Sequence, residues 1–174
     1  MDFEIKDHLI GPAEFIESPN NSERNSSIDL IVIHCISLPE GDFLNSNVID
    51  LFKNKLDFNK HSTFETLKGL KVSAHLFIKR DGKIIQFVPF DKCAWHAGES
   101  LFNDRERCND FSIGIELEGT IDQEFTDKQY ETLKPVILKL KEKYGITDIV
   151  GHSDIAPGRK LDPGPYFDWD KLND

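Results

Sequence analysis

The sequence predicts a single α/β domain in which helices pack on a mixed central β-sheet. Three segments support this fold class. IDLIVIH, at 28–34, is an apolar run rich in β-branched residues, as buried strands are. Residues 72–88 contain two β-rich runs around a short polar turn, which is typical of a hairpin. Residues 127–144 have apolar side chains at helical spacing. Strands that alternate with helices, with one hairpin among them, favour a mixed sheet over a purely parallel one.

The composition agrees with one domain over 1–174, with a core at about 28–170 and an extended lead-in over 1–27. The chain has 174 residues, of which 39% are hydrophobic and 30% charged, and this is enough to bury a core. A formal net charge of -10 argues against a nucleic-acid or anionic-membrane partner, because those partners select basic surfaces. An acidic small molecule remains compatible, since local Arg and Lys side chains can form a pocket for it.

The segment at 45–56 follows a clear pattern, and the segment at 57–70 does not. Apolar residues at helical spacing predict a helix over 45–56, whereas 57–70 follows no clear pattern. In the hairpin, Asp81 and Gly82 predict a two-residue turn of type I′.

The strand predicted at 111–119, FSIGIELEG, has two different faces. Its alternation places the apolar Ile113, Ile115 and Leu117 on one face. The other face then presents Gly114, Glu116 and Glu118.

The helix at 127–144 has clear ends. Thr126 and Gln129 form a capping-box pattern, and Gly145 stands where a helix commonly ends. Pro135 lies inside the pattern, so we expect a kink there or a different boundary. DIVGH, at 148–152, is a short strand that leads into a loop.

The cysteines and the N-terminus predict a cytosolic protein. Cys35, Cys93 and Cys108 are odd in number and lack C-x-x-C spacing, which argues against a disulfide framework or a Cys-rich zinc site. The first residues have no basic region followed by an apolar run, as a signal peptide would. No stretch approaches the roughly 20 apolar residues that cross a membrane.

Two histidines are candidate metal ligands. His34 and His152 each end an apolar strand just before a loop, where sheet proteins commonly bind ligands. Two imidazoles, one carboxylate and an open position make a catalytic zinc site. The loop GHSDIAPGRKLDPGP, at 151–165, supplies two candidate carboxylates, Asp154 and Asp162. Spacing alone does not choose between them, and two histidines held by backbone groups are the alternative.

A metal hydrolase also needs a base for the attacking water and a cation for the oxyanion. Glu116 and Glu118 face the same side of their strand, so either is a candidate base. Lys160 stands two residues before Asp162 and is the candidate cation, although a solvated lysine is the alternative. A cysteine nucleophile is disfavoured, because Cys35 and His34 are strand neighbours that point to opposite faces.

Several ordered motifs resemble the AmpD-type N-acetylmuramoyl-L-alanine amidases, within the zinc amidase group that includes peptidoglycan recognition proteins. The resemblance runs from about Ser18 to Trp169 and rests on these stretches: IVIHCISLPEGDF, VSAHLFIKRDGKIIQFVPFDKCAWHAG, RERCNDFSIGIELEGT, FTDKQYETL and GHSDIAPGRKLDPGPYFDW.

The resemblance implies one zinc ion per chain, held by His34, His152 and Asp162. It implies Glu116 as the catalytic carboxylate and Lys160 as the catalytic lysine. Asp154 would then be structural, and His75 would belong to the core or to the surroundings of the site.

The same resemblance implies a substrate groove lined by Trp95, His96 and Arg107, with Asn109 beside it. Two positions depart from the family pattern and put substrate contacts in doubt. Cys35 replaces a common Asn after the first ligand, and a thiol makes weaker hydrogen bonds than an amide. Lys71 replaces a common Arg, which removes a two-pronged grip on a carboxylate.

The implied activity is hydrolysis of the amide between (1,6-anhydro-)N-acetylmuramic acid and L-alanine, during cytosolic recycling of peptidoglycan. The implied partner is a small muropeptide, with no nucleic acid or membrane, and we expect a monomer. A non-catalytic recognition module on the same fold is the main alternative. An exported wall-lytic amidase is a second alternative.

Overall fold

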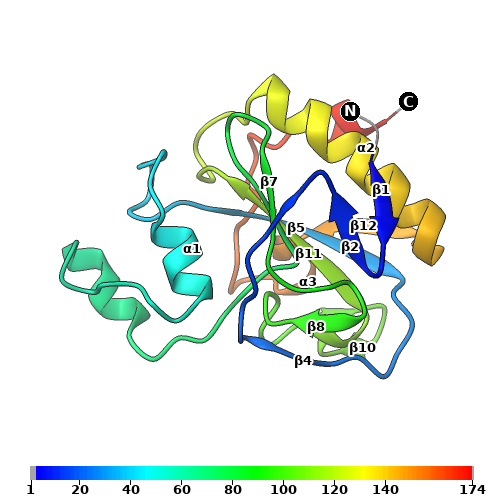
Figure 1. Ribbon diagram of the computed structural model, residues 1–174, viewed down its shortest axis with the longest axis horizontal. Helices are drawn as coiled ribbons and strands as arrows, with labels where there is room; N and C mark the ends of the chain where they lie inside the picture. Colours follow the sequence, from blue (N-terminus) through cyan, green and yellow to red (C-terminus); the bar gives the residue numbers. More distant parts are fainter. Residues whose placement is uncertain (1–2, 174) are drawn as a thin grey trace.

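Six strands form the central sheet of the computed structural model, which describes residues 3–173 (Figure 1). The strand order is β12-β5-β11-β6-β7-β3, and the pairs β12–β5, β5–β11, β11–β6 and β7–β3 are parallel, whereas β6–β7 is antiparallel. The bounds of these strands are β3 Glu14–Phe15, β5 Leu30–Ile36, β6 Leu76–Ile78, β7 Ile84–Gln86, β11 Ser112–Glu118 and β12 Asp148–Gly151. The sheet is therefore mixed, and the predicted α/β fold class is confirmed.

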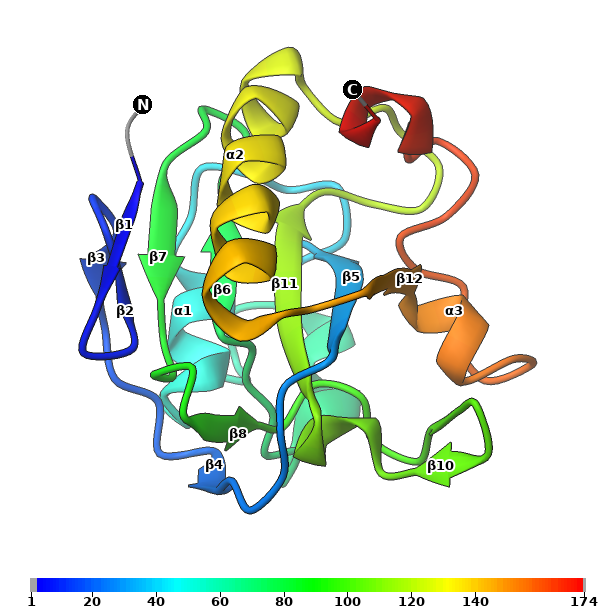
Figure 2. The same ribbon diagram turned by 90° about the vertical axis from the view of Figure 1, so that its right-hand side faces the viewer.

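Helices cover both faces of this sheet (Figure 2). α2 (Asp127–Tyr144) packs on one face, and α1 (Asn47–Phe52) lies behind the other. The 3-10 helix η1 (Ser62–Leu67) joins α1 on that second face through the buried Phe64. The core under α2 holds Ile31, Ile33, Ile113, Ile115, Leu117, Leu133, Val136, Ile137 and Leu140. Alternation then turns the even-numbered residues of β5 and β11 to the opposite face.

The predicted bounds of the long helix agree with α2. The Thr126 hydroxyl accepts from the Gln129 backbone N–H, and the Gln129 side chain accepts from the Thr126 N–H, so the capping box is present. Gly145 ends the helix in the left-handed conformation. The helix continues through Pro135 without a change of boundary. The apolar stripe over several turns stabilises it, because packing outweighs the one hydrogen bond that proline lacks.

The hairpin turn differs from the prediction. The Gly82 N–H donates to the Lys79 carbonyl at 2.8 Å, and the Lys79 N–H donates to the Lys83 carbonyl at 2.9 Å. A type I′ turn needs positive φ at both central residues, but only Gly82 of the Asp81–Gly82 pair has one, at +84°. The loop is thus the three-residue kind, and type I′ is wrong. Gly82 also packs closely on α2, since a Cβ there would lie 2.9 Å from the Lys128 carbonyl oxygen.

The lead-in is more ordered than an extended segment. It contains β1 (Glu4–Lys6), β2 (Leu9–Gly11) and β4 (Asn21–Glu23), besides β3 at the edge of the sheet. β1 and β2 pair with each other, and β4 pairs with β8 (Lys92–Ala94). Strands of two or three residues are too short to show hydrophobic alternation, so composition alone does not reveal them.

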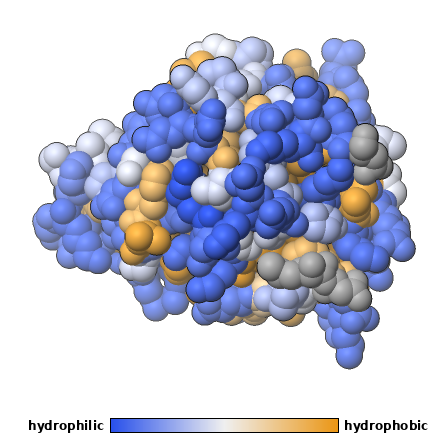
Figure 3. All heavy atoms as spheres, turned by 90° about the horizontal axis from the view of Figure 1, so that it is seen from above, coloured by the Kyte–Doolittle hydropathy of each residue, from blue (hydrophilic) through white to orange (hydrophobic). Residues whose placement is uncertain are grey.

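The remaining elements are short and lie outside the central sheet. They are the hairpin β9 (Leu101–Phe102) with β10 (Arg105–Glu106), the 3-10 helix η2 (Cys108–Asp110), the short helix α3 (His152–Ile155) and the 3-10 helix η3 (Trp169–Leu172). Within residues 3–173, no helix is both long and apolar enough to cross a membrane. The face seen in Figure 3 is mostly hydrophilic, with hydrophobic side chains in small separate groups, in keeping with the charged composition.

Candidate metal centre

Three side chains converge at the C-terminal ends of adjacent strands. His34 lies near the end of β5 and faces away from α2, because its neighbour Ile33 packs beneath that helix. His152 follows β12 directly, as the first residue of α3, and β12 pairs with β5. Asp162 comes from the loop after α3. The donor atoms of these three side chains all lie within 4.8 Å of one another, which makes them a candidate metal site.

The spacing of these atoms suits a small tetrahedral cation. The Nδ1 atoms of His34 and His152 are 2.9 Å apart, and each lies 3.1 Å from Asp162 Oδ2. Ligands that surround zinc tetrahedrally at about 2.0–2.1 Å stand roughly 3.3 Å from one another. His152 Nε2 lies 3.0 Å from the Ala97 carbonyl, which can only accept, so the ring's proton is on Nε2. Its Nδ1 lone pair therefore points at a carboxylate oxygen, an arrangement that a cation stabilises.

The loop that returns Asp162 is fixed by its own backbone. The Ser153 N–H donates to the Asp162 carbonyl at 2.9 Å, which closes the loop, and both Arg159 and Lys160 donate backbone N–H groups to the Ala156 carbonyl. Asp154, the other candidate carboxylate, instead accepts from the Gly151 N–H at 2.7 Å and lies outside the cluster. The geometry thus brings together His34, His152 and Asp162, and leaves Asp154 to hold the turn.

Burial controls the charges of this cluster. Burial lowers the pKa of His34 to about 4, and the neighbouring His152 and Lys160 act in the same direction, so His34 is neutral at neutral pH. Burial acts to raise the pKa of Asp162, but the close contacts with the imidazoles of His152 and His34 outweigh it and keep that pKa below its ordinary value. Neutral imidazoles and an ionised carboxylate are the forms that bind metal.

Glu116 and Glu118 share a face of β11 but have different surroundings. Glu116 pairs in register with His34 on the neighbouring strand, is 9% exposed, and has an Oε2 without a hydrogen-bond partner within residues 3–173. Burial, aided by the charge of Asp162, raises its pKa well above the ordinary value, while Lys160 opposes that shift. Glu118 Oε2 instead accepts from the Arg80 backbone N–H at 3.0 Å. Only Glu116 has a buried oxygen left over beside the cluster, as a catalytic base would.

Lys160 lies near both His34 and Glu116. Its charge lowers the pKa of His34 and the pKa of Glu116. The side chain is neither fully buried nor fully exposed. A cation in this position adjoins the cluster from the loop side, whereas Glu116 adjoins it from the sheet.

Two of the residues expected in the groove are engaged within the protein. His96 is 8% exposed, and its Nδ1 lies 2.9 Å from His34 Nε2. Asn109 Oδ1 accepts from the backbone N–H groups of His96 and Ala97, at 3.1 and 2.8 Å. His96 therefore packs behind the ring of His34, and the Asn109 carbonyl oxygen supports the same segment. Trp95 is half-buried, with its Nε1 donating to Ser22 Oγ at 3.3 Å.

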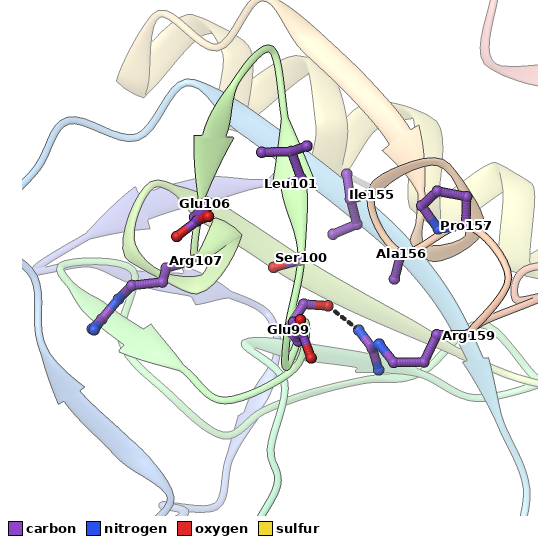
Figure 4. Close-up of a pocket in the computed structure, with 9 residues that line it drawn as sticks. All are labelled: Glu99, Ser100, Leu101, Glu106, Arg107, Ile155, Ala156, Pro157 and Arg159. Atoms are coloured by element: carbon purple, nitrogen blue, oxygen red, sulfur yellow. Dashed lines mark hydrogen bonds between the residues drawn. The ribbon is translucent and has the colours of Figure 1, made fainter.

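Arg107 lies at a separate hollow of about 560 Å³, between the β9–β10 hairpin and α3 (Figure 4). Its side chain is 80% exposed and pairs with Asp110, with Nε 2.9 Å from Oδ2. Arg159, on the other side of the hollow, donates to the carbonyls of Ala97 and Glu99. The residues that line this hollow do not include the cluster ligands, so its size does not make it the centre of the chemistry.

The two positions that depart from the family pattern lie apart from the ligands' donor atoms. Cys35 Sγ donates weakly to the Pro163 carbonyl, at 3.7 Å, and burial raises the pKa of its thiol. Cys35 also lines a hollow with Glu40 and Thr120, beyond the ends of β5 and β11. Lys71 is exposed in the segment before β6. A protonated thiol is a poor nucleophile, which agrees with the argument against cysteine chemistry.

Sequence reasoning missed the support behind the ligands. Gly114 is the signal that points to it, because a glycine inside a strand often marks a close approach by another group. A Cβ at Gly114 would lie 2.4 Å from His96 Cγ. The predicted alternation already placed Gly114 on the face of Glu116, and it therefore marked where a ring packs on the sheet.

Comparisons with known proteins agree with this geometry. The profile of the N-acetylmuramoyl-L-alanine amidase family matches residues 24–165, which include the three clustered ligands. The 1,6-anhydro-N-acetylmuramyl-L-alanine amidase AmpD of Escherichia coli (strain K12) is 53% identical over 165 residues, which cover 92% of this chain and 90% of that protein. A crystal structure of a selenomethionine AmpD derivative is 46% identical, with a TM-score of 0.95 and 97% of both chains covered. The E. coli amidase AmiD, solved with the substrate anhydro-N-acetylmuramic acid-L-Ala-D-gamma-Glu-L-Lys, is 30% identical, with a TM-score of 0.62 over 88% of this chain and 64% of that one.

Proposed function

Because the chain belongs to the N-acetylmuramoyl-L-alanine amidase family, we propose that it hydrolyses the amide between the lactyl group of 1,6-anhydro-N-acetylmuramic acid and L-alanine. The observation that supports this most directly is the pairing of two features. The donors of His34, His152 and Asp162 converge on one point, and the buried Glu116 has an unpartnered carboxylate oxygen beside them. A binding module has no need of the second feature, whereas a hydrolase does.

We propose zinc as the metal that His34, His152 and Asp162 hold. Two imidazoles, one carboxylate and an open fourth position are the ligand set of catalytic zinc. Zinc in such a site polarises a carbonyl group and lowers the pKa of a bound water to roughly 7.

Glu116 then acts as the base, and Lys160 as the oxyanion partner. Glu116 accepts one proton from the water whose oxygen attacks the carbonyl carbon, and the carbonyl π electrons move to its oxygen. The Lys160 ammonium stabilises the negative charge on that oxygen. As the C–N bond breaks, Glu116 returns the proton to the leaving nitrogen. The products are a sugar with a free lactyl carboxylate and a peptide with a free L-alanine amino group.

The proposed setting is the recycling of cell-wall fragments in the cytosol, by a monomeric enzyme. The half-buried Trp95 and the exposed Arg107 and Lys71 are the proposed substrate contacts. Of these, Arg107 suits a stem-peptide carboxylate because its guanidinium donates through several N–H groups, although Asp110 must share it. Cys35 lines its hollow near the strand ends and is proposed to face the substrate there.

Metal analysis and a product assay on the purified chain test this function together. We expect one zinc per chain, and release of the intact tripeptide from anhydro-muramyl tripeptide. Treatment with a chelator should stop the release, and added zinc should restore it. A zinc-free protein that binds the fragment without cleaving it would contradict the proposal and favour a recognition module.

A further inference from the structure

The two histidine ligands are held from behind by the same two consecutive residues. His34 Nε2 lies 2.9 Å from His96 Nδ1, and His152 Nε2 lies 3.0 Å from the Ala97 carbonyl oxygen. His34 and His152 come from different elements of the fold, yet their outer nitrogens meet one short segment after β8. Because the outer hydrogen bond of an imidazole decides which nitrogen faces a metal, this segment controls both rings.

The protons of the His96 contact can be placed by following its hydrogen bonds. The Ser112 hydroxyl donates to the Cys108 carbonyl at 2.5 Å, so its oxygen is free to accept from His96 Nε2 at 3.1 Å. A neutral imidazole has one N–H, and here it is on Nε2, which leaves His96 Nδ1 as an acceptor. His34 must then donate from Nε2 and present an unprotonated Nδ1 to Asp162 and His152. Each hydrogen bond in this series is donated in the same direction, away from the cluster.

The segment that holds the ligands is itself fixed at several points. Asn109 Oδ1 accepts from the N–H groups of both His96 and Ala97, at 3.1 and 2.8 Å. Arg159 Nη2 donates to the Ala97 carbonyl at 2.6 Å. Gly114 provides the space for the His96 ring, since a Cβ there would lie 2.4 Å from His96 Cγ. The side chains of this support come from separate parts of the chain and meet at one place.

We propose that His96 and Asn109 are positioning residues of the metal centre. His96 fixes the ring orientation and tautomer of His34, and Asn109 holds the backbone of residues 96–97 so that His96 and the Ala97 carbonyl meet their two ligands together. This inference rests on the metal site of the proposed function. It assigns His96 to the metal and not to the substrate groove, where the family resemblance would place it.

Three variants and a measurement of zinc affinity test the role of His96. His96→Leu removes the acceptor, whereas His96→Asn keeps an amide oxygen near the position of Nδ1. His75→Leu is the matched control, because His75 is also buried but hydrogen-bonds to Gly114, Lys92 and Arg24 instead of to His34 or His152. Each metal-free protein competes for zinc with a chromophoric chelator. We expect affinity to fall about 10- to 100-fold in His96→Leu, to recover most of that loss in His96→Asn, and to stay near the wild-type value in His75→Leu.

The histidine tautomers of the zinc-loaded wild-type protein give a second, independent readout. Long-range ¹H–¹⁵N correlation spectra distinguish Nδ1–H from Nε2–H imidazoles without any variant, so this test does not depend on whether His96→Leu folds. The expected result is that His34, His152 and His96 all have their proton on Nε2. A proton on His96 Nδ1 would overturn the inference.

Two outcomes of the affinity measurement would also overturn the inference. The first is a His96→Leu affinity within about threefold of wild type, well short of the loss expected for a supporting residue. The second is an equal loss in His96→Leu and His75→Leu, which would indicate general disruption of packing. A wild-type protein that binds no zinc is a separate result, because it refutes the proposed metal site itself.

Discussion

Replacing Glu116 by Gln tests whether this carboxylate is the base. The substitution keeps the size of the side chain and removes only the group that accepts a proton. Glu116 is 9% exposed and pairs in register with His34, while its Oε2 has no hydrogen-bond partner in residues 3–173. No internal hydrogen bond of that oxygen is therefore lost, and the clustered His34, His152 and Asp162 keep their own partners. The variant should fold and hold the metal but lose its turnover.

The magnitude follows from the role and the burial of the group. A positioned base contributes about 10²- to 10⁴-fold to a rate, so kcat should fall by that factor, which corresponds to roughly 3–5 kcal/mol. The raised pKa of Glu116 also predicts that its negative charge, although needed for activity, destabilises the fold. A folded-state pKa above the ordinary value of 4.5 means that the folded protein binds the proton more tightly, so ionising Glu116 opposes folding as pH rises above that value. At neutral pH, Glu116→Gln should therefore unfold at a temperature no lower than wild type.

The assay follows product release from anhydro-muramyl tripeptide, with zinc content measured on the same samples. Glu118→Gln is the matched control, because it lies on the same face of β11 and its amide oxygen can still accept from Arg80. The control should retain activity within a few-fold of wild type. The reasoning is refuted if Glu118→Gln is the inactive variant, or if Glu116→Gln turns over normally while it holds zinc.

Three further experiments test the proposed ligands, the buried His75 and the close packing at Gly114. Asp162→Ala should lose both zinc and turnover, whereas Asp154→Ala should keep its zinc; equal zinc content in the two purified variants would contradict the ligand set. His75, buried with a pKa lowered to about 3 from 6.5, resists protonation in the fold, so stability should fall as pH drops from 6.5 towards 3. The free energy of unfolding of the metal-free protein should fall more steeply with acid than that of His75→Gln, by roughly 1 kcal/mol per pH unit. Equal slopes for the two proteins would show that His75 does not cause the loss of stability in acid. Gly114→Ala should destabilise the fold by about 1–3 kcal/mol, because its Cβ would lie 2.4 Å from the His96 ring, and should weaken zinc binding; wild-type stability in denaturant titration would show that His96 moves without cost.

The elements with strong periodicity could be predicted from the sequence. α2 has the predicted bounds because its cap, its apolar stripe and Gly145 all indicate the same helix. β11 has the predicted faces, since the alternation extends over seven residues. The lead-in and the hairpin turn could not be predicted in the same way, because β3 and Gly82 take their structure from packing against distant segments.

The candidate site could also be predicted from the sequence only in part. The strand-end positions of His34 and His152 could be read from the sequence, and the structure brings both to one cluster with Asp162. Local pattern could not choose Asp162 over Asp154, because the choice depends on the loop closure at Ser153. It also could not place His96 behind His34, since two residues 62 positions apart meet there only in the folded chain.

The construction of the loop bears on how the site is prepared for catalysis. Asp162 is the most accessible of the three clustered side chains, with 15% of its side chain exposed against 1% for His34 and 4% for His152, so the cluster opens to solvent at this loop. That loop is closed by backbone hydrogen bonds of its own, at Ser153 and at Ala156. Backbone hydrogen bonds therefore fix the loop that carries the carboxylate, and the histidines are oriented by the segment behind them. A site whose donors are fixed beforehand loses little conformational freedom when a metal or a substrate binds, and holding reactive groups in place is itself a large part of catalysis.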